Sequence, residues 1–191
     1  MAQRNKTRYA IMSLLSERPR TGYDIKKALE EKEIYFWSES YGQIYPILHK
    51  LAEEGLADKK KAPTERHPNR TVYQLSQRGR EELVEWLKRP ADTIPLRIEL
   101  LLKLRYGALS TPEDNLALIE EYREGQLGDI DRLEEQLSKH TGAEAGEFYA
   151  RLTLQYGIEL KRALVRWCAE ALAAIEQRTE QPGGYRRPPV R

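Results

Sequence analysis

The residues best suited to chemistry are polar and aromatic side chains between positions 40 and 50. If the apolar residues of this segment face a core, the outward positions are Ser40, Tyr41, Gln43, Tyr45, His49 and Lys50. A Gln amide can pair with adenine through two hydrogen bonds, hydroxyl groups can bond to bases or phosphates, and a Lys ammonium can contact a phosphate. The acidic residues Glu53 and Glu54 lie at the far end, so the beginning suits a polyanion. The alternative is an ordinary amphipathic helix with a solvated face.

A basic hairpin is expected next, from two strand-like runs near residues 56–62 and 70–75. Pro63 and Pro68 in the connection are turn residues. Its candidate contacts to a nucleic-acid backbone are Lys60, Lys61, Arg66, His67, Arg70 and Thr71. Side chains alternate along a strand, so the lysines at 59–61 cannot all touch one surface. The alternative is that these charges keep an exposed sheet edge from pairing.

A third candidate site is the start of the helix that precedes the 40–54 segment. Thr21 and Asp24 have the spacing of a capping box, with Asp in place of the usual Glu. Thr21, Tyr23 and Lys26 therefore lie on the first turn of a helix, where free N–H groups can hold a phosphate. Plain capping by Thr21 is the alternative, and the two roles are compatible.

The elements that position these residues follow a distinctive order. Apolar periodicity predicts helices over 5–17, with Asn5 as its cap, over 21–31 and over 40–54. Gly55 is expected to end the third helix. Pro46 should lie in or near its first turn, because deeper in the helix it would remove a hydrogen bond. Three helices and a hairpin predict a winged helix-turn-helix, whose second motif helix enters the DNA major groove.

A fourth helix is expected over 77–88, with Leu83, Val84 and Leu87 buried, and it completes a DNA-binding domain over 1–90. The fold class is therefore mainly α, with an N-terminal winged helix-turn-helix, a two-stranded β wing and an all-α C-terminal domain.

The second half is expected to form a helical dimerisation domain over 91–180. Residues 96–106 are apolar on most sides, which predicts a helix buried between layers, and longer helices are expected over 112–139 and 146–178. The last helix has two apolar strips, so it needs two partners, one being the 112–139 helix and the other a second subunit. The residues assigned to dimerisation are Phe148, Leu152, Tyr156, Leu160, Leu164, Trp167 and Leu172. Residues 181–191 form a Pro/Gly-rich basic tail, which is expected to be disordered.

Charge is distributed unequally between the two halves of this 191-residue chain. Residues 1–90 hold 18 Lys and Arg against 13 Asp and Glu, a net charge of +5, whereas 91–191 hold 14 against 17, a net charge of −3. The basic half is therefore the one expected to meet a polyanion. No apolar run reaches about 18 residues, so no membrane span is expected. The single cysteine, Cys168, excludes an intrachain disulfide and favours a cytoplasmic protein.

Catalysis is not expected. His49, His67 and His140 lack metal-ligand spacing, Cys168 lies on an apolar strip, and adjacent carboxylates such as Glu53 and Glu54 diverge on a helix. No Gly-rich phosphate loop is present. We therefore predict no catalytic residue, no metal site and no cofactor. Trp37, Trp86 and Tyr106 are candidates for a pocket that binds a small-molecule effector, with the alternative that they are core aromatics.

Five segments resemble the PadR-family transcriptional regulators. They are RYAIMSLL at 8–15, TGYDI at 21–25, YGQIYPILHKL at 41–51, EGL at 54–56 and YQLSQRG at 73–79. The helical second half resembles the longer PadR subgroup by length and pattern. The resemblance implies a homodimer, usually a repressor, that a small molecule or another cellular signal releases from double-stranded DNA. With two recognition helices one DNA turn apart, the expected operator is an inverted repeat. The alternative is a winged-helix protein–protein adaptor without specific DNA binding.

Overall fold

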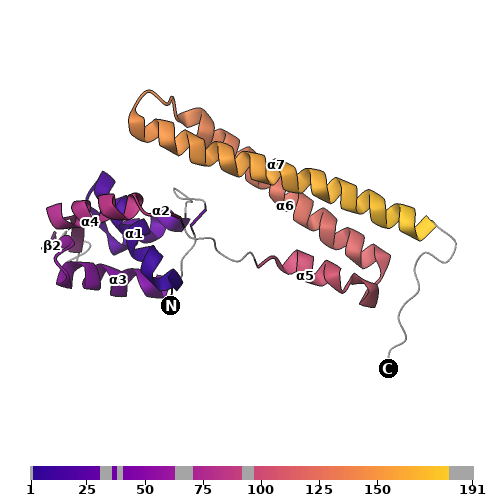
Figure 1. The fold of residues 1–191 in the computed structure, drawn as a ribbon, viewed down its shortest axis with the longest axis horizontal. Helices are drawn as coiled ribbons and strands as arrows, with labels where there is room; N and C mark the ends of the chain where they lie inside the picture. The colour runs from indigo at the N-terminus through magenta and orange to yellow at the C-terminus, as the bar shows by residue number, and fades with distance from the viewer. Residues whose placement is uncertain (1, 31–35, 38–40, 63–70, 92–96, 181–191) are drawn as a thin grey trace. The chain divides into compact units, whose positions relative to one another are not determined.

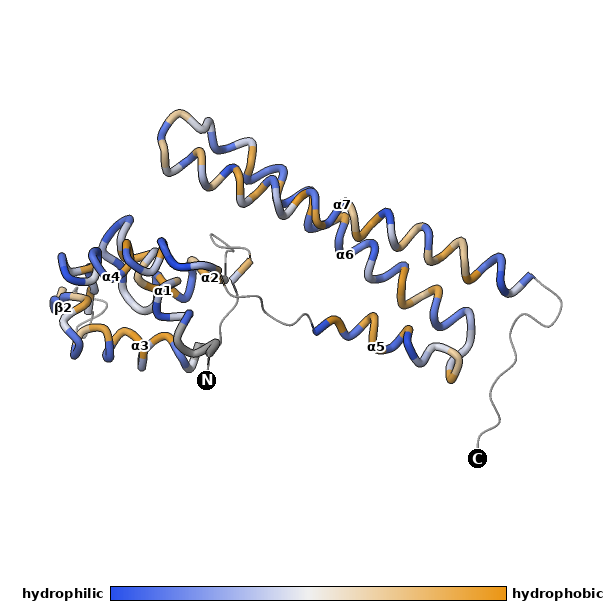
Figure 2. The backbone as a smooth tube through the Cα atoms, in the orientation of Figure 1, coloured by the Kyte–Doolittle hydropathy of each residue, from blue (hydrophilic) through white to orange (hydrophobic). Residues whose placement is uncertain are grey.

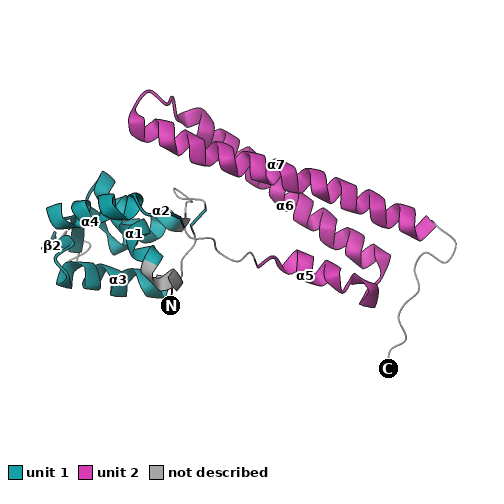
Figure 3. Cartoon of the chain, in the orientation of Figure 1, with its two compact units in different colours: residues 1–93 teal, residues 94–191 magenta. Residues whose placement is uncertain are grey.

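The computed structural model describes residues 2–30, 36–37, 41–62, 71–91 and 97–180. The chain divides into two compact units, unit 1 over 1–93 and unit 2 over 94–191 (Figures 1 and 3). The predicted fold class is confirmed: unit 1 combines helices with a small antiparallel sheet, and the elements of unit 2 are all helical. The predictions for Ser40, Arg66, His67 and Arg70 and for the 181–191 tail lie outside the described residues. Within the described ranges, no helix is long and apolar enough to cross a bilayer.

The described residues of unit 1 form the helices α1 (Ala2–Glu17), α2 (Gly22–Glu30), α3 (Tyr41–Glu53) and α4 (Gln77–Leu87). They share one core, which the apolar stripes of α1, α2 and α3 fill with side chains less than a tenth exposed. These include Tyr9, Met12, Leu15, Ile25, Ala28, Ile44, Leu48 and Leu51. Because α1 begins at Ala2, Asn5 lies inside the helix and is not its cap, contrary to the prediction.

In the part of unit 1 that the structure describes, the sheet has three strands, β1 (Arg20–Thr21), β2 (Ala57–Lys61) and β3 (Thr71–Leu75), in the order β1-β3-β2 and antiparallel throughout. The hairpin β2–β3 is the predicted wing. The two-residue strand β1 was not predicted, because it is too short to show a periodicity. Its residue Arg20 is buried and donates hydrogen bonds to the Leu14 carbonyl at 3.2 Å and to Glu17 at 2.8 Å, which ties β1 to the end of α1.

The end of α3 is fixed at Gly55, as predicted. Gly55 has a φ of 68°, and the Leu56 amide bonds to the Leu51 carbonyl while the Gly55 amide bonds to that of Ala52. This is the Schellman motif, which uses the left-handed conformation that glycine adopts without strain. The chain leaves α3 at this point and enters β2 two residues later, at Ala57.

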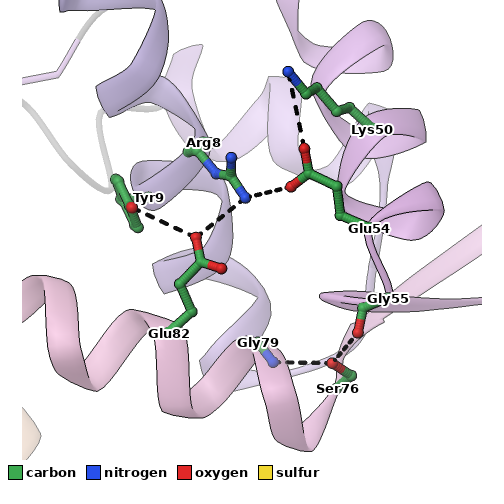
Figure 4. Close-up of polar contacts among 8 residues, drawn as sticks. All are labelled: Arg8, Tyr9, Lys50, Glu54, Gly55, Ser76, Gly79 and Glu82. Atoms are coloured by element: carbon green, nitrogen blue, oxygen red, sulfur yellow. Dashed lines mark hydrogen bonds and ion pairs between the residues drawn. The ribbon is translucent and has the colours of Figure 1, made fainter.

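The beginning of α4 is fastened to the same point. The Ser76 hydroxyl caps α4 by accepting from the Gly79 amide at 3.0 Å, and it donates to the Gly55 carbonyl at 2.8 Å (Figure 4). The Ser76 amide bonds to the Leu56 carbonyl at 3.1 Å.

Helix α4 buries fewer apolar residues than predicted. Leu83 is buried, but Val84 and Leu87 are 49% and 65% exposed. The buried direction of the helix is set by Leu83 and by Trp86, whose ring stacks on Tyr9 of α1 with centroids 4.5 Å apart. Val84 and Leu87 each follow one of these residues and so lie about 100° further round the helix, away from the core.

Unit 2 consists of α5 (Glu99–Arg105), a 3-10 turn η1 (Gly107–Leu109), α6 (Pro112–Lys139) and α7 (Ala145–Glu180). Thr111 and Asp114 form a capping box at the start of α6, with Pro112 at the first position. Helices α6 and α7 lie side by side along their length (Figure 1), and hydrophobic stretches recur along both (Figure 2). Leu100, Ile119 and Cys168 form the centre of the unit's core.

Helix α5 differs from its prediction. Leu100 is buried, whereas Leu101 and Leu102 are 48% and 62% exposed in the single chain. The helix packs on α6 with one side, so it is not enclosed between layers.

Prediction from the fold. Replacing Gly79 with alanine should lower the free energy of unfolding by about 1–3 kcal/mol, the usual cost of overpacking. A Cβ on Gly79 would lie 2.1 Å from the Leu56 carbonyl oxygen, and backbone cannot move aside as a side chain can. Urea unfolding measures the change. The matched control is Gly125→Ala in α6, where a Cβ meets nothing within 4 Å. Equal unfolding midpoints for Gly79→Ala and the wild type would contradict the prediction.

Candidate nucleic-acid interface

Helix α3 presents an exposed face beside its buried stripe. Tyr45, His49 and Lys50 are exposed, and Gln43 is half-buried. Pro46 is also exposed on this face, although it was not predicted to be an outward residue. Tyr41 is the first residue of the helix. The exposed face thus combines hydroxyl, imidazole and ammonium groups, which can contact bases and phosphates.

Pro46 lies deeper in α3 than predicted. The prediction put it in or near the first turn, and the structure places it sixth in the helix, in the second turn. A proline at this position has no N–H to donate to the carbonyl four residues earlier, that of Gly42. The helix continues through it because the stripe of Ile44, Leu48 and Leu51 is fully buried in the core.

The N-terminus of α2 forms the predicted capping box. The Thr21 amide donates to the Asp24 carboxylate at 2.8 Å, and the Asp24 amide donates to the Thr21 hydroxyl at 3.1 Å. Tyr23 is exposed, and Lys26 is half-buried. The Asp24 carboxylate places a negative charge at this helix end, and a negative charge there repels a phosphate. The contacts of Thr21 and Asp24 therefore support helix capping more directly than phosphate binding.

Tyr45 joins α3 to this helix end. Its ring lies against Gly22, the first residue of α2. It also lies close enough to Tyr73 of β3 to affect that phenol: burial raises the pKa of Tyr73, and the nearby Tyr45 raises it further. Tyr45 therefore stands where α2, α3 and β3 meet, although it is about half exposed.

The strand register sorts the lysines of the wing. Lys59 lies opposite Tyr73 and Lys61 opposite Thr71, whereas Lys60 lies opposite Val72. Side chains directly opposite each other share a face of the sheet, so Lys59 and Lys61 lie on the face of the buried Tyr73 and Lys60 on the other. Lys60 and Lys61 are both exposed, and Thr71 is half-buried. The two predicted lysine contacts thus point to opposite faces.

An ion-pair network at the end of α3 was missed by the sequence analysis (Figure 4). Arg8 of α1 places Nη2 2.6 Å from a carboxylate oxygen of Glu54 and 3.2 Å from one of Glu82 on α4. Glu54 also lies 3.8 Å from Lys50, and the Tyr9 hydroxyl donates to Glu82 at 3.5 Å. No local signal marks this network, because Arg8 and its partners are 46 and 74 residues apart in the sequence.

The residues assigned to dimerisation fall into two groups on α7. Phe148, Leu152, Tyr156 and Leu160 are exposed. Leu164, Trp167 and Leu172 are half-buried, and the last two pack against the core of unit 2. Cys168 is fully buried, and its burial raises the pKa of the thiol, in agreement with its predicted place on an apolar strip.

The three aromatics proposed for an effector pocket belong to different units. Trp86 stacks on Tyr9, and Trp37 packs against the core of unit 1. Tyr106 is exposed in unit 2, directly after α5. For Trp86 the contacts fit the alternative of a core aromatic.

Comparison with known proteins identifies relatives of both units. Residues 11–85 match the transcriptional regulator PadR-like family, and residues 96–176 match the C-terminal domain named for virulence activator alpha. The negative transcriptional regulator PadR of Bacillus subtilis is 28% identical over 178 residues, which cover 89% of this chain and 97% of PadR.

Solved structures of Bacillus subtilis PadR are similar over nearly the whole chain. PadR in complex with operator DNA matches with a TM-score of 0.79 at 26% identity, covering 88% of this chain and 98% of PadR. PadR in complex with p-coumaric acid matches with a TM-score of 0.73 at the same identity and coverage.

Prediction from the ion-pair network. Arg8→Met should lower the free energy of unfolding by about 1–2 kcal/mol, because two carboxylates that share one cation are left facing each other. The additional change Glu54→Gln should restore part of this loss by removing one of the two negative charges. Thermal unfolding of the variants measures both effects. Lys103→Met is the control, since its pair with Glu99 is exposed and joins residues of one helix. An Arg8→Met variant as stable as the wild type would show that the network does not hold α1, α3 and α4 together.

Proposed function

We propose that the chain is a repressor that binds an inverted-repeat operator as a homodimer, because residues 11–85 match the PadR-like family of transcriptional regulators and the chain is 28% identical to a negative regulator named PadR. The observation that carries the proposal is the match over 88% of the chain to PadR bound to operator DNA. In this proposal α3 is the recognition helix, which enters the major groove of DNA. Its exposed Tyr45, His49 and Lys50, together with Ser40, Tyr41 and Gln43, are proposed to contact bases and phosphates.

The wing and the start of α2 add contacts to the DNA backbone in this proposal. Lys61 shares a face of the hairpin with Thr71, and Lys60 points to the other face, so the two lysines are proposed to serve different parts of the backbone. Arg66, His67 and Arg70 are the proposed contacts of the wing tip. Thr21, Tyr23 and Lys26 are the proposed contacts of α2. The sign of regulation rests on the likeness to a negative regulator.

The homodimer is proposed to form through α7. Phe148, Leu152, Tyr156 and Leu160 recur every four residues along one side of the helix and are each about half exposed or more in the single chain. Burying such side chains against a second copy is favourable by about 25 cal/mol per Å² of apolar surface. Leu164, Trp167 and Leu172 continue the contact in the proposal, although Trp167 and Leu172 also pack within their own chain.

Release from DNA is proposed to follow from a small molecule or another cellular signal. Support comes from the solved complex of PadR with p-coumaric acid. No catalytic role is proposed for any residue of the chain. A ligand can cause release only if it binds the free state of the protein more tightly than the DNA-bound state.

Prediction from DNA binding. Selection from a pool of random-sequence duplexes should enrich an inverted repeat, because a two-fold dimer presents two equal recognition helices. If the dimer makes about 6–10 phosphate contacts, affinity for the selected duplex should fall by about 10³ to 10⁵ between 50 and 200 mM salt. A scrambled duplex of equal length is the control. Equal affinity for both duplexes, or no enrichment, would favour the protein–protein adaptor instead.

Prediction from the α7 interface. The double substitution Leu152→Glu and Leu160→Glu should convert the dimer to a monomer, because it places two carboxylates from each chain in an apolar contact. Light scattering after size-exclusion chromatography measures the mass in solution. Ser138→Glu adds the same group at an exposed polar position of α6 and should leave the dimer intact. A dimer that survives the double substitution would exclude this face of α7 as the interface.

A further inference from the structure

Gly22 provides the space that the ring of Tyr45 occupies. A Cβ built on Gly22 would lie 2.5 Å from Cε1 of Tyr45, 2.9 Å from Cζ and 3.1 Å from Cδ1. Non-bonded carbon atoms are normally separated by about 3.5–4.0 Å. The ring therefore rests directly on the backbone of Gly22, and any side chain at this position would displace it.

The backbone gives no other reason for a glycine at this position. Gly55 and Gly142 have positive φ values, but Gly22 does not, so its conformation is open to other residues. Alanine is also the better helix former, and Gly22 is helical. What distinguishes glycine here is the close approach of Tyr45.

The contact fixes a side chain on the exposed face of α3. Tyr45 is 52% exposed, and its neighbours on that face, His49 and Lys50, are exposed as well. A ring that rests on the backbone of α2 has already lost part of the side-chain freedom that it would otherwise lose on binding a ligand.

We propose that Gly22 is a positioning residue for DNA binding: it seats the Tyr45 ring against α2 and so preorganises Tyr45 for contact with the operator. The inference rests on the proposed function. It assigns to the sequence TGYD a role beyond helix capping, because Thr21 and Asp24 cap the helix and Gly22 serves the recognition helix. Gly22 itself need not touch DNA.

Gly22→Ala should separate DNA affinity from stability. The atoms that meet the new methyl group belong to the outer end of a half-exposed side chain, so the ring can swing away while the backbone stays in place. This differs from Gly79, where the obstructing atom is the Leu56 carbonyl oxygen. We expect Gly22→Ala to unfold at the same urea concentration as the wild type or a higher one, and to bind the selected duplex about tenfold more weakly.

A double-mutant cycle tests whether Gly22 acts through Tyr45. The proteins are the full-length wild type, Gly22→Ala, Tyr45→Ala and the double variant, and the probe is the duplex enriched from the random pool. Tyr45→Ala should weaken binding about tenfold, and adding Gly22→Ala to it should cause no further loss. Gly125→Ala is the control for a glycine-to-alanine change in a helix with open space and should bind as the wild type does.

Two results would overturn the inference while leaving the proposed function intact. Either Gly22→Ala binds the duplex as tightly as the wild type, or its effect multiplies with that of Tyr45→Ala, so that the double variant binds more weakly than Tyr45→Ala alone at equal stability. If Gly22→Ala unfolds more easily, the last comparison still decides, because the double variant has no ring to displace. If the wild type enriches no duplex, the proposed function fails and the inference falls with it.

Discussion

The carbonyl group of Leu56 is the point on which unit 1 depends, because α3 ends, β2 begins and α4 starts around it. Its oxygen accepts a hydrogen bond from the Ser76 amide, and Gly79 approaches it so closely that no side chain fits between them. Ser76 binds the preceding residue, Gly55, with its hydroxyl. Helix α3 and the hairpin β2–β3 therefore diverge from one junction, and backbone contacts at that junction set the direction of each relative to the other. A DNA-binding surface made of two separate elements requires such a fixed angle.

Ion pairs made by Arg8 of α1 stabilise this junction. Glu54 follows the last residue of α3, where a carboxylate is unfavourable next to the partial negative charge of a helix C-terminus. Arg8 compensates for this and binds Glu82 of α4 with the same nitrogen. Arg8 is mostly buried and lies 2.6 Å from Glu54, whereas Lys50 is exposed and lies 3.8 Å from it. Arg8 is therefore the closer partner of Glu54. Lys50 is thereby held only loosely, at 3.8 Å, on the face proposed to meet DNA. The acidic end of α3 thus belongs to the scaffold and not to the interface.

Features that depend on neighbours in the sequence could be predicted, and features that depend on distant partners could not. The capping boxes at Thr21 and Thr111 and the helix end at Gly55 involve atoms three to five residues apart, so the sequence contains the whole interaction. The width of the apolar stripe that a helix buries could not be predicted in this way, because it depends on distant partners. Periodicity placed Val84 and Leu87 in the core, but the core face of α4 is decided by Tyr9, which stacks on Trp86 from 77 residues away. For the candidate site, residue types predicted the exposed Tyr45, His49 and Lys50. The contact of the Tyr45 ring with Gly22 could not be predicted, because it depends on the packing of α3 against α2.

In unit 2, part of the apolar pattern is buried within the single chain, and part stays exposed and is available to a second chain. Along α7 the side chains toward α6, such as Leu154 and Ile158, are buried, while Phe148, Leu152 and Tyr156 on another side stay exposed. Toward its C-terminal end the corresponding residue Trp167 is covered by its own chain, which leaves the exposed apolar run confined to the first half of the helix. Leu101 and Leu102 of α5 are exposed as well. Soluble monomers rarely leave so many large apolar side chains in water without an interaction that uses them. The proposed homodimer gives these residues a common explanation, since the helices that are amphipathic within one chain would become fully packed between two.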